Sequence, residues 1–99
     1  MMKHELKTDP EVFDAVKSGL KTFEIRKDDR NFQIGDVLVL RRTKYTGEEM
    51  QNGMPLEYTG TPLTVVVSYV LRGPLYGLAD GWSILSIRHD DYAYIIGNE

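Results

Sequence analysis

The chain has 99 residues, a formal net charge of −3, 41% hydrophobic and 27% charged residues, and no cysteine. This length suits one domain with a single modest core. The absence of cysteine excludes disulfides, thiolate zinc sites and cysteine nucleophiles. The sequence holds no apolar run of about 18 residues, as a transmembrane helix needs, and no apolar signal core near its N-terminus, so we expect a cytoplasmic protein with no membrane partner.

The distribution of charge is more informative than its sum. A net acidic chain is a poor candidate for wrapping duplex nucleic acid, which usually requires a strongly basic face. However, more than half of the 12 Lys and Arg residues fall between Lys21 and Lys44. This clustering permits a local positive patch on an acidic protein.

A short helix is predicted after an extended segment at residues 3–7. Thr8 is placed to cap the helix, Pro10 suits its first turn, and Glu11 completes a capping box. Gly19 offers a left-handed stop. We therefore expect a helix of roughly 8 to 10 residues that packs on a sheet through an apolar stripe at helical spacing: Val12, Phe13 and Val16.

The period changes to two after the helix. Phe23 and Ile25 alternate with polar residues, as in a half-buried strand. The charged residues of this segment are Lys21, Glu24 and Arg26. Because Lys21 shares parity with Phe23, its side chain reaches the face of Glu24 only if the chain bends at the strand entrance. Three charges of both signs at the mouth of a strand are able to hold an anionic or hydrogen-bonding ligand.

The rest of the chain is richer in strands than in helices. Residues 37–40 are apolar on both faces and predict a central, covered strand. Residues 63–71 predict the strongest strand, with one face made of Leu63, Val65, Val67, Tyr69 and Leu71. Further strands are predicted at 82–88 and 92–96, with a loop at 73–81 and a polar loop or hairpin extension at 43–60.

Strands joined by turns, without helical crossovers between them, favour a small barrel that leaves no sticky edges. We therefore predict an α+β fold: one domain over residues 1–99, built as a small mixed β-barrel of five or six strands with one or two short helices.

Residues 19–26, Gly-Leu-Lys-Thr-Phe-Glu-Ile-Arg, resemble the Gly-x-Lys-x-x-Glu-x-Arg signature of ASCH domains in the PUA-like superfamily. Residues 32–36, Phe-Gln-Ile-Gly-Asp, are similar to the Gly-Asp turn that opens the next barrel strand in that superfamily. The opening at 4–7 and the segment at 77–82 resemble one branch, a domain of unknown function (DUF3850) found in bacteria and phages.

The resemblance implies a PUA-like β-barrel with a cleft beside the helix, in a superfamily linked to RNA binding, RNA modification and translation. Our leading hypothesis is a monomer that binds RNA or a nucleotide-like ligand in this cleft, with no metal and no cofactor. The residues expected to line the site are Lys21, Glu24 and Arg26, with Lys27 and Arg30 at its rim and Trp82 as a stacking platform.

Each of these residues also has a purely structural interpretation. Lys21 and Arg26 can form surface ion pairs with Glu24, worth less than about 1 kcal/mol, and Glu24 can serve only to orient Arg26. Trp82 can pack at the end of the barrel, and the polar turn that carries Lys27 and Arg30 can be merely solvated.

An enzyme is the alternative. Some ASCH members resemble this chain in fold but are small amidohydrolases acting on N4-acetylated cytidine. The resemblance then implies that Lys21 acts as nucleophile or base and Glu24 as proton carrier. The chain departs from those members in having Glu24 where they have threonine, and after Glu57 its only glutamate is Glu99. A third hypothesis is an accessory domain that binds a protein partner through residues 43–60.

Overall fold

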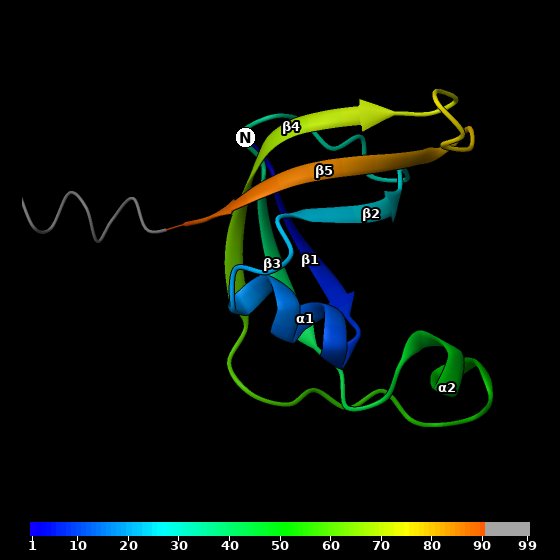
Figure 1. Ribbon diagram of the computed structural model, residues 1–99. Coiled ribbons are helices and arrows are strands. Elements are labelled where there is room, and N and C mark those ends of the chain that lie inside the picture. Colours follow the sequence, from blue (N-terminus) through cyan, green and yellow to red (C-terminus); the bar gives the residue numbers. More distant parts are fainter. Residues whose placement is uncertain (91–99) are drawn as a thin grey trace, which may run out of the picture.

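The computed structural model describes residues 1–90 and contains five strands and two short helices (Figure 1). Their order along the chain is β1 (Lys3–Thr8), α1 (Pro10–Lys17), β2 (Phe23–Lys27), β3 (Val37–Arg42), α2 (Gly47–Gln51), β4 (Leu63–Arg72) and β5 (Trp82–His89). The strand predicted at 92–96 lies outside the described residues. Neither described helix has the length and apolar character needed to cross a membrane.

The five strands form one sheet in the order β1-β3-β4-β5-β2. β1 and β3 are parallel, which the α1 crossover permits, and the other pairs are antiparallel. The sheet curls into a half-barrel, so that β1 and β2, the two edge strands, approach one another (Figure 1). The predicted fold class, a small α+β mixed barrel with two short helices, is confirmed.

The core lies on the concave side of the sheet, where α1 packs. Its buried residues are Leu6, Phe13, Val16, Phe32, Leu38, Leu40, Val65, Val67, Leu85 and Ile87. Phe13 and Val16 are the buried part of the predicted helical stripe, and Gly19, at φ +84°, ends the helix as expected. The predicted cap is wrong: Asp9 is the N-cap, and it makes no side-chain capping bond. Thr8 is unable to cap because it completes β1 and donates its hydroxyl to the Leu6 carbonyl.

The alternation predicted for β2 is present, but its polar side faces the core. Glu24 is 2% exposed, whereas Phe23 and Ile25 are 40% and 50% exposed. Binary patterning alone assigns the apolar side to the core, so this inversion marks β2 as a strand shaped by something other than core packing. β3 also differs from expectation: Leu38 is fully buried, but Val37 on the other face stays partly exposed.

A β-bulge interrupts β4 between Val67 and Tyr69 and accompanies a bend visible in Figure 1. Val67 pairs with Ile87, but Tyr69 pairs with Ser86, so Ser68 is the extra residue. An extra residue exchanges the two faces of everything that follows it. Tyr69 therefore points outward rather than sharing a face with Val67, which corrects the continuous alternation predicted for 63–71.

A buried hydrogen bond between two side chains anchors the start of β1. His4 Nε2 lies 2.9 Å from Asp36 Oδ2, and the backbone N–H groups of Met2 and Gln33 also donate to the Asp36 carboxylate. Burial by itself raises the pKa of Asp36, but these hydrogen bonds together hold the pKa below its ordinary value. The Asp36 carboxylate of the Gly-Asp turn therefore connects the start of β1 to the start of β3 through hydrogen bonds.

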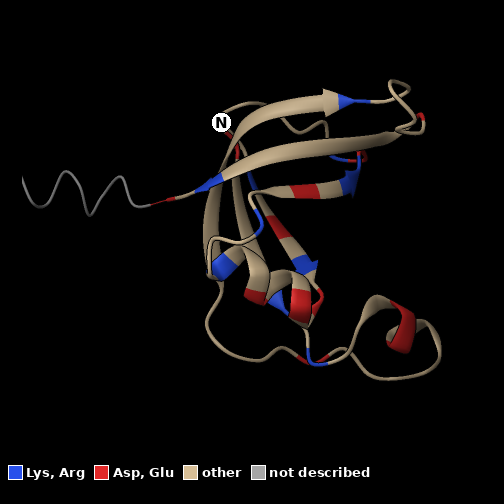
Figure 2. Cartoon of the chain, in the orientation of Figure 1, with Lys and Arg blue, Asp and Glu red and all other residues tan. Residues whose placement is uncertain are grey.

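Residues 43–60 form an extension that projects away from the sheet (Figure 1). Its base is a short antiparallel contact in which Thr43 bridges Tyr58. Its tip holds α2, which begins with a capping box between Thr46 and Glu49. Figure 2 shows that α2 is acidic, with Glu48 and Glu49 in its first turn.

Candidate functional site

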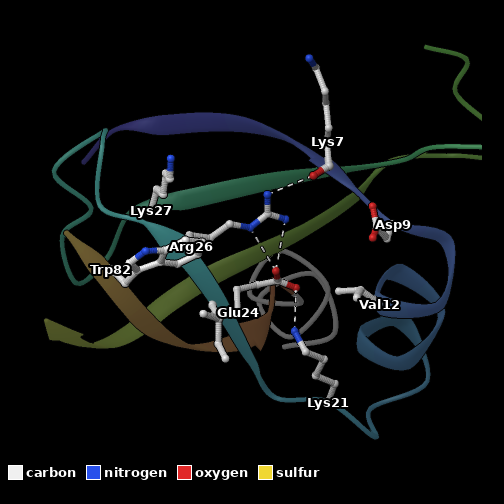
Figure 3. A pocket seen from close by; sticks show the side chains of 9 residues that line it. Lys7, Asp9, Val12, Lys21, Glu24, Arg26, Lys27 and Trp82 are labelled. Atoms are coloured by element: carbon white, nitrogen blue, oxygen red, sulfur yellow. Dashed lines mark hydrogen bonds and ion pairs between the residues drawn. The ribbon is translucent and has the colours of Figure 1, made fainter. Parts of the chain in front are cut away.

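A hollow of about 510 Å³ opens where the two edge strands approach one another (Figure 3). We call it the Glu24 hollow. Its lining comes from the end of β1, the start of α1, the strand β2 and the first residue of β5: Lys7, Asp9, Val12, Lys21, Glu24, Ile25, Arg26, Lys27 and Trp82.

Glu24 sits between two cations at the bottom of this site. Its Oε1 lies 3.3 Å from the ammonium of Lys21, and its Oε2 accepts a hydrogen bond from Nε of Arg26 at 3.2 Å and lies 3.2 Å from Nη2 of the same guanidinium. The side chain of Glu24 is 3% exposed, and those of Lys21 and Arg26 are 21% and 22% exposed. A carboxylate this deeply buried requires such compensation. The three tips meet, as Figure 3 shows, on the inner side of β2.

The turn after α1 brings Lys21 into this cluster. The left-handed Gly19 ends the helix, and the Lys21 N–H donates to the Ala15 carbonyl at 3.0 Å. The ammonium then donates to the Phe23 carbonyl at 2.6 Å and passes over the Phe23 ring, 4.7 Å from its centroid. The chain thus bends at the strand entrance, which is the condition under which Lys21 reaches the face of Glu24.

Arg26 is committed to the β1 edge as well as to Glu24. Its Nη1 donates to the Lys7 carbonyl at 3.0 Å, and its Nη2 donates to the Thr8 hydroxyl at 3.3 Å. Arg30 acts similarly nearby, donating to the Glu5 carbonyl at 2.8 Å. The half-barrel is therefore closed by guanidinium groups where a backbone ladder would close a full barrel. Most of the Arg26 donors are occupied, so Arg26 positions Glu24 more than it offers itself to a ligand.

The hollow offers a ligand three amines and one aromatic wall. The Lys21 ammonium retains a donor beyond its two bonds, Lys7 and Lys27 line the rim, and Trp82 is 38% exposed beside Lys27, its register partner. Asp9 is the acidic group at the rim. Such a mixture can hold an anion with the amines while a flat ring stacks on the indole.

The structure brings together Lys21, Glu24, Arg26, Lys27 and Trp82, five of the six predicted site residues, around the Glu24 hollow. Arg30 instead lines a smaller adjoining hollow of about 150 Å³ with Leu6 and Phe32. Sequence reasoning missed Lys7 and Asp9. No local motif could have found them, because they reach the site only through the curvature that brings β1 toward β2. Among the described residues, no three His, Asp or Glu side chains are grouped to hold a metal.

The protein is thus a small α+β half-barrel with a charged hollow between its two edge strands, β1 and β2. A family model for a domain of unknown function (DUF3850) matches residues 3–87, and the chain belongs to that family. It is 39% identical over 51 residues to an uncharacterized 12.9 kDa protein in the GpA 3′ region of Escherichia phage P2. That match covers 48% of this chain and 47% of the phage protein, so it spans about half the length of each.

Proposed function

We propose that the protein binds RNA or a nucleotide-like ligand in the Glu24 hollow. The observation that carries the proposal is the ammonium of Lys21, held in place by the Glu24 carboxylate and the Phe23 carbonyl at the edge of a hollow walled by Trp82. A fixed cation beside an exposed aromatic ring fits the two halves of a nucleotide, phosphate and base. The resemblance to ASCH and PUA-like domains supports the same conclusion.

The charged residues of the Glu24 hollow would have different roles in binding. The Glu24 carboxylate is nearly inaccessible, so it contributes by fixing Lys21 and by accepting a hydrogen bond from any ligand group that reaches its Oε1 edge. A base amino group, such as N4 of cytosine, suits that edge. Lys7 and Lys27 would supply phosphate contacts at the rim.

Fluorescence anisotropy with a labelled single-stranded RNA of mixed sequence tests the proposal. Lys21→Ala should weaken binding by about tenfold, or about 1.4 kcal/mol, and should lower the slope of log K against log salt by about 1. Lys17→Ala is the matched control, because it removes the same charge from the exposed end of α1. Equal binding by wild type and Lys21→Ala, at every salt concentration, would exclude the hollow as the RNA site.

The second candidate is an amidohydrolase for N4-acylated cytidine. It is favoured by one observation, the 3.3 Å approach of the Lys21 ammonium to the Glu24 carboxylate within a hollow of about 510 Å³. Such a pair has the geometry of a nucleophile beside its proton carrier. Incubation of the purified protein with N4-acetylcytidine tests it by chromatography. Release of cytidine that Lys21→Met abolishes would support this candidate, whereas no release at high protein concentration would eliminate that substrate.

A further inference from the structure

The convex side of the sheet carries an aromatic surface that adjoins the Glu24 hollow. We call it the outer face and define it by six side chains: Phe23 and Ile25 on β2, Ile84 and Trp82 on β5, and Tyr69 and Leu71 on β4. Register places them in neighbouring rows. Phe23 and Tyr69 flank Ser86, and Ile25 and Leu71 flank Ile84.

Three of the four most exposed members of this surface are aromatic. Tyr69 is 57% exposed, Phe23 40% and Trp82 38%, and the fourth, Ile25, is 50% exposed. The helix α1 packs on the opposite, concave side with the core. A solvent-facing apolar surface of this kind on a small protein usually marks an interaction site.

Two local features of the strands turn these side chains toward the outer face. The inverted patterning of β2 places Glu24 inside and therefore turns Phe23 and Ile25 outward. The bulge at Ser68 turns Tyr69 and Leu71 to the same side. In a regularly alternating strand, Tyr69 would share the inner side of the sheet with Val67, two residues earlier, so the outward facing of Tyr69 and Leu71 depends on the bulge.

The charged side chains that the strands present at the outer face are positive. Lys27 lies opposite Trp82 in the register, Arg88 lies opposite Val66, and the Lys21 ammonium sits over the Phe23 ring. In the three strands that build the face, the only acidic residue is Glu24, and it points inward. In a chain of net charge −3, this distribution favours an anionic partner with flat apolar groups.

The outer face is continuous with the Glu24 hollow. Ile25 and Trp82 belong to both, and Lys21 reaches around the edge of β2 between Glu24 and the Phe23 ring. We propose that the outer face is a stacking platform for single-stranded RNA. The inference rests on the proposed function: one nucleotide occupies the hollow, and the neighbouring unpaired bases stack on Phe23 and Tyr69.

Unpaired bases are the ligand chemistry that this surface suits. Phe23 and Tyr69 lie two strands apart, or about 10 Å, which leaves room for a separate base at each ring. Because the Lys21 ammonium lies over one face of the Phe23 ring, a base would stack on the other face. Exposed aromatic side chains on a sheet can stack bases of any sequence, because every base has a π-face. A duplex offers no free base faces along its length, so it should compete poorly for this surface.

The test compares Tyr69→Ala with Tyr69→Phe, using labelled oligo(U) and oligo(A) alongside the mononucleotides UMP and AMP. Tyr69→Ala should weaken oligonucleotide binding by about fivefold or more and leave mononucleotide binding unchanged, whereas Tyr69→Phe retains the ring and should bind as wild type. Tyr76→Ala is the control, because Tyr76 is 95% exposed in the loop outside the strands. Trp82, the only tryptophan, should be quenched by the oligonucleotides.

Each result has one meaning. Oligonucleotide binding by Tyr69→Ala equal to that of wild type overturns the platform, while retained Lys21-dependent binding of mononucleotides leaves the proposed function intact. If wild type binds neither form, the proposed function fails and the platform with it. If Tyr69→Ala converts a dimer to a monomer in light scattering without changing RNA binding, the outer face is a self-association surface and the proposal is wrong.

Discussion

Glu24 is the residue on which the site depends, because it compensates two cations from a position nearly closed to water. Removing one partner of a buried pair leaves the other partners uncompensated, which costs more than the pair contributes when intact. Here Lys21 and Arg26 keep about a fifth of their side-chain surface exposed, so water can recover part of the loss.

We therefore expect Glu24→Ala to lower the free energy of unfolding by about 2 to 3 kcal/mol, at the low end for a buried charge pair. Urea denaturation followed by Trp82 fluorescence measures it. Glu24→Gln preserves the shape and can still accept from Arg26, so it should cost less. Glu5→Ala is a useful comparison, because the Glu5–Arg41 pair is largely exposed and should contribute under about 1 kcal/mol. Equal losses for Glu24→Ala and Glu5→Ala would contradict the role assigned to Glu24.

At the scale of the secondary-structure elements, the bulge in β4 matters most. It allows one strand to bury Val65 and Val67 near its start and to present Tyr69 outward near its end. A deletion or insertion in a strand reverses the facing of all residues on one side of the change. The bulge is thus the element that relates the core to the outer face.

Deleting Val66, a paired residue before the bulge, should destabilise the protein severely, because Val65 and Val67 would become neighbours and one of these two core residues would have to turn outward. We expect a loss of more than about 2 kcal/mol, comparable to emptying or overfilling a core position. Ser68→Ala keeps the residue count at an exposed position and should stay within about 0.5 kcal/mol of wild type. Thermal unfolding of the two variants side by side measures the difference. A deletion variant as stable as Ser68→Ala would show that the inward facing of Val65 and Val67 does not fix the register of β4.

The elements themselves were largely predictable from the sequence, and their facing was not. Helical spacing located α1, and period-two patterns located β2, β3, β4 and β5. The patterns failed where a charge or an extra residue overrode them, at Glu24 and Ser68. The convergence of Lys21, Glu24 and Arg26 followed from their closeness in sequence, but Lys7 and Asp9 join them only through sheet curvature, which no local pattern encodes.

For the molecule as a whole, the buried, hydrogen-bonded Asp36 carboxylate makes the free energy of unfolding depend on pH. The folded-state pKa of Asp36 lies below its ordinary value, because hydrogen bonds to the carboxylate outweigh the effect of burial. The unfolded chain therefore binds the proton more readily, and the contribution of Asp36 to stability is present above its unfolded pKa of about 3.9. That contribution is lost as the pH falls through the folded pKa.

The urea midpoint of the wild type should accordingly fall as the pH is lowered from about 5 toward 3. Asp36→Asn should be less stable at neutral pH but should show a smaller fall over the same range, since its amide has no proton to take up. Asp80→Asn, on an exposed loop, should reproduce the wild-type profile. An Asp36→Asn profile parallel to that of wild type would show that other carboxylates govern acid unfolding.

The guanidinium closure of the half-barrel also bears on how the protein behaves at high concentration. An unpaired edge strand is a template on which strands of other molecules can add, and this is how sheets grow into aggregates. Arg26 and Arg30 occupy the Lys7 and Glu5 carbonyls, so these two backbone acceptors of β1 are not free to pair with another chain. We therefore expect Arg26 and Arg30, which hold β1 and β2 together, also to hinder the addition of a strand from another molecule at the β1 edge.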